Sequence, residues 1–108
     1  MRAPAEYTPR VLRRSEVALL VAMYWPWDEQ DNALAVAVLE SGLDTGAWNV
    51  SGEDSRGLWQ VNVAPGAHPD LATSNLWDPM VNAFWAYNIW KESGWRAWYN
   101  SALRLGLL

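Results

Sequence analysis

Residues 33–42 of this chain are Ala33-Leu34-Ala35-Val36-Ala37-Val38-Leu39-Glu40-Ser41-Gly42, an apolar run that ends in a carboxylic acid. The alanines, and a length of about twelve residues from Asp28, favour a buried helix over a buried strand. Gly42 is expected to end that helix. A carboxyl group at such an end has one apolar side and one open side, which raises its pKa. Glu40 is therefore a candidate general acid; the simpler alternative is a polar residue that marks the solvent end of a helix.

The composition is that of one folded domain without disulfide bonds. The chain has 108 residues, of which 51% are hydrophobic and 19% charged, and it has no cysteine. This length is sufficient for one hydrophobic core, and we expect an N-terminal arm over residues 1–14 and a single domain over residues 15–108. The net charge of −4 argues against a nucleic-acid backbone or an anionic membrane as the partner, since both would repel it. His68 is the only histidine, so neither a metal nor a cofactor is expected.

No targeting segment is evident. No apolar stretch approaches the roughly twenty residues that a membrane span requires. The stretch from Arg13 to Tyr24 has a weak likeness to a signal peptide, but Glu16 interrupts it and Trp25-Pro26-Trp27 replaces the small-residue cleavage site. We therefore expect a soluble protein that, if it acts outside the producing cell, gets there by another route.

Three further segments carry helix signals. Ser15 to Tyr24 has apolar residues at helical spacing and is stopped by Pro26. Asp78-Pro79 is a strong helix start, because the carboxylate can cap the first turn and proline is tolerated there. Apolar residues at helical spacing continue this helix until Gly94. A last short helix is expected from Trp95 to about Leu105.

Asn49 to Asn62 is the only segment that predicts β structure. It is rich in Gly, Ser, Asn and Asp and closes on the alternation Leu58 to Asn62, which indicates a small hairpin or an irregular loop. On an extended segment Gln60 and Asn62 would point to one face and offer a sugar both donors and acceptors; ordinary outer-face residues of a hairpin are the alternative. The predicted fold class is mainly α (α+β), with one small β element beside the end of a central buried helix.

Five motifs in a fixed order resemble a known family, the lysozyme-like lytic transglycosylases, particularly the compact versions found in phage tail and lysis proteins. The motifs are Glu40-Ser41-Gly42, Ser55-Arg56-Gly57-Leu58-Trp59-Gln60-Val61-Asn62, His68-Pro69, Asp78-Pro79-Met80-Val81-Asn82-Ala83 and Gly94-Trp95-Arg96-Ala97-Trp98. Each motif is weak alone, whereas five in order with compatible spacing are specific. The likeness covers residues from Ser15 to Tyr99 and implies a lysozyme-like fold.

The resemblance also implies roles for individual residues. Glu40 is the catalytic acid, and the sugar cleft is formed in part by Ser41, Gln60 and Asn62. Gly57 lets the backbone turn or approach a ligand closely. Asn82 would hold the catalytic helix or loop in place; the alternative is an asparagine on a helix surface.

Aromatic residues add further candidates for substrate binding. An indole face packs against the apolar face of a pyranose, and Trp48, Trp59 and Trp77 lie in loop or hairpin context. Trp59 alternates with Gln60, so it would face the core if Gln60 faces the cleft. Tyr99-Asn100-Ser101 resembles the Tyr-Asn-Ala segment of soluble transglycosylases, whose tyrosine approaches the catalytic glutamate; Tyr99 would otherwise cap the core.

The choice between hydrolase and transglycosylase depends on a second carboxylate. A retaining hydrolase needs one about 5 Å from the acid, and an inverting one needs it roughly 6.5 to 9.5 Å away. Ser55 stands where similar animal lysozymes have that carboxylate. Asp54 is one residue off, which turns it to the other face of a strand unless a bulge restores it. Glu53 has the right parity but lies two residues further along.

The absence of a firm second carboxylate favours a transglycosylase, in which Glu40 is acid and then base. The expected reaction is cleavage of the β-1,4 bond between N-acetylmuramic acid and N-acetylglucosamine in peptidoglycan, with 1,6-anhydro-muramyl products. Two alternatives stay open: muramidase hydrolysis with Asp54 or Glu53, and a non-catalytic glycan-binding or virion structural module. The expected site of action is the bacterial cell wall, with a phage tail or virion assembly as a further partner.

Overall fold

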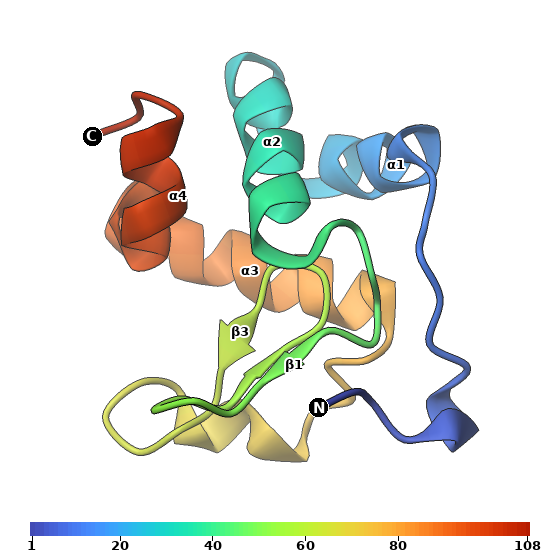
Figure 1. Cartoon of the computed structure of the whole chain (residues 1–108). Coiled ribbons are helices and arrows are strands. Elements are labelled where there is room, and N and C mark those ends of the chain that lie inside the picture. Colours follow the sequence, from blue (N-terminus) through green and yellow to red (C-terminus); the bar gives the residue numbers. More distant parts are fainter.

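Helix α2 (Gln30–Ser41) stands at the centre of the computed structural model, which describes all 108 residues. Helix α1 (Arg14–Tyr24) lies on one side of it and α4 (Tyr99–Arg104) on the other, while α3 (Pro79–Ser93) crosses beneath (Figure 1). A three-stranded sheet lies below the C-terminal end of α2. Short 3-10 helices connect these elements: η1 (Ala5–Tyr7), η2 (Trp27–Glu29), η3 (Pro69–Thr73) and η4 (Gly94–Trp98). The mainly helical α+β class expected from the sequence is confirmed.

The helix boundaries follow the local signals in the sequence. The side chain of Asp78 accepts a hydrogen bond of 2.9 Å from the backbone N–H of Met80, so it caps α3 as expected. Gly42 ends α2 with φ of 61°, and Leu43 follows with φ of 63°. Two successive left-handed residues turn the chain sharply away from the helix axis. Glu40 consequently sits in the last turn of α2, directly before the chain leaves the helix.

The sheet is smaller than the sequence alternation suggests. Strands β1 (Trp48–Asn49), β2 (Ser55–Arg56) and β3 (Val61–Asn62) pair antiparallel in that order. The expectation of an extended segment from Leu58 is wrong, because residues 57–60 form a turn in which Gln60 has φ of 51°. The parity argument that placed Gln60 and Asn62 on one face therefore does not apply, since Gln60 lies outside the strand.

The C-terminal segment is two short helices rather than one. Helix η4 ends at Trp98, which has φ of −114° and ψ of 57°, and α4 begins at Tyr99. The break is fixed by burial, because the indole N–H of Trp98 donates a 2.7 Å hydrogen bond to the carbonyl of Trp59. This change of direction lays α4 beside the end of α2 (Figure 1).

A cluster of aromatic rings fills the core between α1, α3 and η4. Trp25, only 2% exposed, lies at its centre and stacks on Trp59 with ring centroids 5.2 Å apart. The other rings around Trp25 are those of Tyr87, Trp90 and Trp95. Aromatic pairs of this kind contribute roughly 0.5–1.5 kcal/mol each beyond the area that they bury. Most of the nine tryptophans therefore stabilise the fold.

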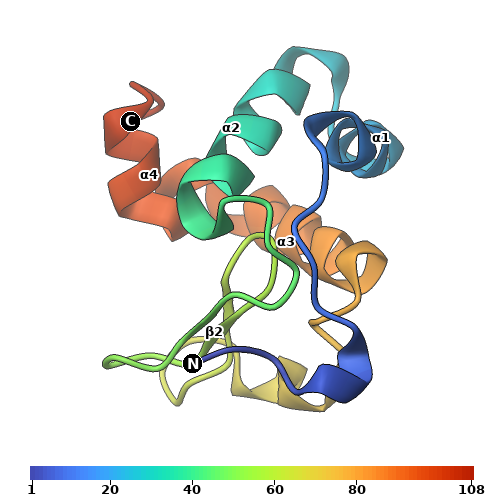
Figure 2. The same cartoon turned by 45° about the vertical axis from the view of Figure 1, so that its right-hand side comes forward.

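The N-terminal arm runs from α1 along the outside of the molecule to the loop after α2 (Figure 2). Backbone hydrogen bonds join Leu12 to Leu43 (2.9 Å) and Ala3 to Gly46 (3.0 Å). The guanidinium of Arg2 forms an ion pair with Asp44. These contacts tie the arm to the segment that follows the helix of Glu40. None of the helices has both the length and the apolar character needed to cross a bilayer.

Candidate active site

The carboxyl group of Glu40 is half-buried in the last turn of α2 and is held by one side chain from α4. The hydroxyl of Ser101, itself only 5% exposed, donates a hydrogen bond of 2.5 Å to Oε2 of Glu40. The two residues are 61 positions apart in the chain. Because Oε2 already accepts this bond, a proton on the neutral acid is best placed on Oε1. Ser101 therefore fixes both the position of the carboxyl group and the oxygen that can carry its proton.

The environment of Glu40 favours its protonated form. Burial raises the pKa of Glu40, the Ser101 hydroxyl lowers it, and the negative charge of Glu53 raises it again. Burial is the largest of the three effects and acts by disfavouring the charged carboxylate. The net direction is upward, which is the direction that a general acid near neutral pH requires.

The loop before β3 is locked to α3 by the side chain of Asn82. Asn82 is fully buried; its Oδ1 accepts from the N–H of Trp59 (2.9 Å), and its Nδ2 donates to the carbonyls of Arg56 (2.8 Å) and Leu76 (2.9 Å). Gly57 has φ of 75°, and a Cβ there would lie 2.4 Å from Asn82 Nδ2. Only glycine fits so close to this amide. The alternative of a helix-surface asparagine is wrong, since no part of Asn82 is on the surface.

The same loop positions α2. The indole N–H of Trp59, which is fully buried, donates a 3.0 Å hydrogen bond to the carbonyl of Ala33 in the first turn of α2. Asn82 therefore fixes the loop on α3, and the loop fixes the helix that carries Glu40. Trp59 faces the core, so its interpretation as a cleft residue is wrong.

Gln60 and Ser41 use their polar atoms within the protein. The amide Nε2 of Gln60 donates to the carbonyls of Ala47 (2.9 Å) and Gly57 (3.0 Å). The hydroxyl of Ser41 donates to the carbonyl of Ala37 (3.0 Å) and accepts from the N–H of Leu43 (3.1 Å). The side-chain oxygen of Gln60 has no hydrogen-bond partner within the protein, whereas both contacts of the Ser41 hydroxyl shape the end of α2.

Asn62 and Trp48 also have structural contacts. Oδ1 of Asn62 accepts from the backbone N–H of Asp54 (3.1 Å) and of Ala64 (3.0 Å), which leaves its Nδ2 free. The half-buried indole of Trp48 donates to Asp54 (2.8 Å), and its ring packs edge-on against Trp77 at 5.3 Å. Trp77 is only 7% exposed, and it lines the cavity between the N-terminal arm and the start of α3, which Glu40 does not line.

The structure brings Ser101 of α4 to Glu40, while Tyr99 lies at the start of the same helix. Tyr99 is 58% exposed and has no hydrogen bond, so it does not cap the core. Two residues apart on a helix, Tyr99 and Ser101 point to nearly opposite sides. Sequence reasoning does not find Ser101, because this serine of the Tyr-Asn-Ser segment stands where the family pattern has an alanine.

The acids that could serve as a second carboxylate differ in their hydrogen-bond and ion-pair partners. Asp54 forms a two-pronged ion pair with Arg56 (2.9 and 3.0 Å), and the Arg56 hydrogen bonds hold the pKa of Asp54 below its ordinary value. Asp44, a further acid shortly after the end of α2, is paired with Arg2. Glu53 accepts a 2.5 Å hydrogen bond from the Ser55 hydroxyl, and its charge acts on Glu40. Of the three acids, Glu53 is the one electrostatically coupled to Glu40.

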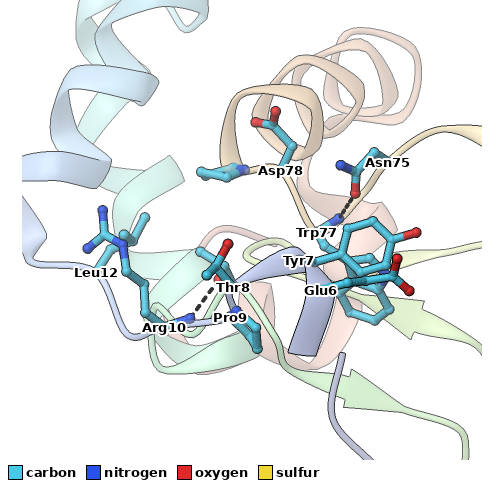
Figure 3. Close-up of a pocket in the computed structure, with 11 residues that line it drawn as sticks. Glu6, Tyr7, Thr8, Pro9, Arg10, Leu12, Asn75, Trp77 and Asp78 are labelled. Carbon is cyan, nitrogen blue, oxygen red and sulfur yellow. Dashed lines mark hydrogen bonds between the residues drawn. The ribbon is translucent and has the colours of Figure 1, made fainter. Parts of the chain in front are cut away.

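Two larger cavities open on the surface of the protein. The first, of about 710 Å³, lies between the N-terminal arm and the start of α3, with Tyr7 and Trp77 together on one wall and Asp78 nearby (Figure 3). The second, of about 350 Å³, is lined by residues of β3, the loop after it, α3 and η4, including Gln60 and Asn62. Glu40 lines neither cavity. No group of three or more His, Cys, Asp or Glu side chains is close enough to hold a metal ion.

A raised-pKa carboxyl group at the end of a central helix, beside a small antiparallel sheet, defines a lysozyme-like domain. The chain belongs to the family described as lysozyme-like domain, whose sequence model matches residues 26–100. Comparison with curated proteins and with solved structures gives no match. Membership in the family supports a general role in cleaving the glycan of peptidoglycan.

Proposed function

We propose that the protein is a peptidoglycan lytic transglycosylase that cuts the β-1,4 bond between N-acetylmuramic acid and N-acetylglucosamine. Glu40 acts first as general acid and then as general base. The observation that carries the proposal is the state of Glu40, half-buried with a raised pKa and with one oxygen held by Ser101.

The reaction needs no other group to move a proton. Protonated Oε1 of Glu40 gives its proton to the glycosidic oxygen as the bond from that oxygen to C1 of the muramyl sugar breaks. The resulting carboxylate then takes the proton of the muramyl 6-hydroxyl, and O6 closes onto C1 as a 1,6-anhydro ring. Glu40 is protonated again at the end, and no water is consumed.

The first step requires the protonated form of Glu40 and the second requires its carboxylate, and the surroundings of Glu40 contain a group or effect that favours each form. Burial keeps the acid protonated for the first step. The Ser101 hydrogen bond stabilises the carboxylate that exists between the steps. Asp54 forms an ion pair with Arg56, and this pairing supports a route without a second carboxylate.

Hydrolysis of the same bond is a second candidate function, because Glu53 is coupled to Glu40. Its charge raises the pKa of Glu40, which places the two carboxyl groups within electrostatic reach. In this route Glu53 would activate a water molecule or form the covalent intermediate. Ser55, which donates to Glu53, would then orient the second carboxylate. Asp54 is the weaker choice for this role, since Arg56 and Trp48 occupy its oxygens.

The mass of the released fragments distinguishes the candidates. Purified peptidoglycan is incubated with the protein and the soluble muropeptides are weighed. Transglycosylation gives products one water lighter than the reducing muropeptides, whereas hydrolysis gives reducing ends. Glu40→Gln should abolish release, and Glu6→Gln, the same substitution at an exposed glutamate of the arm, should not. Release that survives Glu40→Gln, or no release at all, contradicts both routes; binding without release would leave a glycan-binding or virion structural module.

We also propose that the protein acts on the cell wall from a phage tail or virion. Only the resemblance to compact phage transglycosylases supports this. The net charge of −4 would repel an anionic wall at long range, and tethering to a larger assembly would remove that difficulty.

A further inference from the structure

The outer face of α1 is apolar along its length. Leu19 and Met23 are 71% and 55% exposed, and each follows a buried valine, Val17 or Val21, by two residues. Side chains two residues apart on a helix point to nearly opposite sides, so Leu19 and Met23 face away from the core. Residues 17–27 contain no charged side chain, whereas a surface helix ordinarily carries charged residues on its outer face.

No other element covers this face. Helix α1 makes its main contacts with α2 and α3, on the side of its buried valines. Ala18 and Ala22, both exposed, form a row of small side chains beside Leu19 and Met23, because each pair has the helical spacing of four residues. Small side chains at a contact let two helices approach closely. Contiguous exposed apolar surface marks a site of interaction with another molecule.

The two ends of α1 have opposite charges. Arg14, in the first turn, is exposed and has no ion pair, and Glu16 of the same turn is paired with Arg10. Asp28 is also exposed and without an ion pair. It follows Tyr24, the last residue of α1, by four residues, a length of chain that spans at most about 14 Å.

The charge of Arg14 favours a partner helix that runs in the opposite direction. A cation in the first turn is disfavoured by the dipole of its own helix and is stabilised at the C-terminal end of another helix. An antiparallel partner would bring its C-terminal end to Arg14. A copy of α1 in that position would also bring Asp28 to the same end.

We propose that the outer face of α1 pairs with the same face of a second copy of this chain, with the two helices antiparallel about a two-fold axis. With the axis midway between Leu19 and Met23, each leucine lies opposite the methionine of the other copy, and the two alanine rows face each other. A two-fold contact of this kind uses one patch on both copies. A parallel pair would place like charges together at both ends, which is costly, so the charges select the antiparallel pair.

This pairing leaves the candidate active site open. Ser101 holds Glu40 from α4, and α4 lies on the side of α2 opposite to α1 (Figure 1). Two copies joined through α1 would therefore both keep Glu40 accessible. The pairing does not depend on the proposed cleavage of peptidoglycan.

The methionines give a direct probe of the contact. The chain has three of them, and Met23 is the one on the outer face of α1. The NMR signals of isotope-labelled methionine methyl groups are followed as the protein is diluted from about 1 mM, since one helix face per copy makes a small and weak interface. The Met23 signal should move with concentration, while those of Met1 and Met80, which are also exposed, should stay in place. Sedimentation equilibrium of the same samples should show a mass that rises from 12.2 kDa toward twice that value.

Substitutions on α1 test the apolar contact. Leu19→Glu should weaken the association at least about tenfold, because it places an unpaired charge in the centre of the interface. Leu103→Glu is the matched change at an exposed leucine of α4 and should associate as the wild type does. Circular dichroism of both variants checks that the helices are intact.

Charge substitutions test the direction of the pair. Arg14→Asp alone and Asp28→Arg alone place like charges together and should each weaken the association about three- to tenfold. An equimolar mixture of the two variants should recover it, because one copy then has acids at both ends of α1 and the other has bases.

Several results would overturn the pairing. They are a protein that stays monomeric at about 1 mM, a Met23 signal that does not move, association that survives Leu19→Glu, and charge variants that associate no better in the mixture than alone. Binding of a monomer to phosphatidylcholine vesicles with a shift of the Met23 signal would also overturn it, and would assign the face to a lipid surface. Muropeptide release by a monomer would leave the proposed function standing, whereas association through α1 without any release would do the reverse.

Discussion

Replacement of Asn82 by alanine tests whether one buried amide holds the loop before β3 on α3. The substitution leaves three backbone groups without their partner, namely the N–H of Trp59 and the carbonyls of Arg56 and Leu76. A buried polar group that loses its partner costs about 1–3 kcal/mol. Because water can enter the space left by the amide, we take the lower value for each group. The expected loss is then about 3 kcal/mol, a large part of the 5–15 kcal/mol that stabilises a typical domain.

The measurement is urea unfolding followed by tryptophan fluorescence. With a urea dependence of about 1–3 kcal/mol per molar, 3 kcal/mol corresponds to a midpoint lower by about 1–3 M. Asn88→Ala is the matched control on the same helix, because its amide only donates to the carbonyl of Phe84 one turn earlier. This control should change the unfolding free energy by less than about 0.5 kcal/mol. Equal effects of the two substitutions, or a loss below about 1 kcal/mol for Asn82→Ala, would refute the reasoning.

Two further predictions concern the proton of Glu40. Ser101→Ala removes the hydroxyl that lowers the pKa of Glu40, so the alkaline limb of kcat/KM should move to higher pH. Glu53→Gln removes the negative charge that raises this pKa, so the alkaline limb should move to lower pH. A pH–rate profile of each variant checks this, and shifts in the same direction would contradict it. Since the pKa of Glu40 is raised in the folded state, the folded protein binds the extra proton, and stability is lost as pH rises through that pKa. Glu40→Gln should therefore raise Tm at pH 8 and lose this advantage as pH falls to the ordinary range of a glutamate. Thermal unfolding across this range checks the prediction, and an unchanged Tm at every pH would contradict a raised pKa for Glu40.

The helices were predictable because their end signals act between neighbours in the chain. Asp78 caps the N–H of Met80 two residues on, and the left-handed conformation of Gly42 depends on its own missing side chain. Such contacts form in the same way whatever surrounds the helix. The position of Glu40 in the last turn of α2 follows from these local effects alone.

The loop from Gly57 to Gln60 shows where local reasoning fails. Its alternating residues predict an extended strand, but Asn82 of α3 binds the backbone at Arg56 and Trp59 and holds the loop in a turn. The burial of Trp59 against α2 then turns the indole into the core. Contacts with residues more than twenty positions away overrode the local preference, as happens often for short strands.

The sequence by itself determined the family, most of the helices and the position of the candidate acid at the end of α2, since these depend on motif order and on local capping. Only the tertiary structure decided the surroundings of that acid. The Ser101 hydroxyl reaches Glu40 because Trp98 ends η4 and turns α4 toward α2, and Arg56 withdraws Asp54 while Glu53 stays coupled to Glu40. The strength with which a carboxyl group holds its proton depends on burial and on charges within a few ångströms. Those neighbours come from distant parts of the chain, and packing alone brings them together.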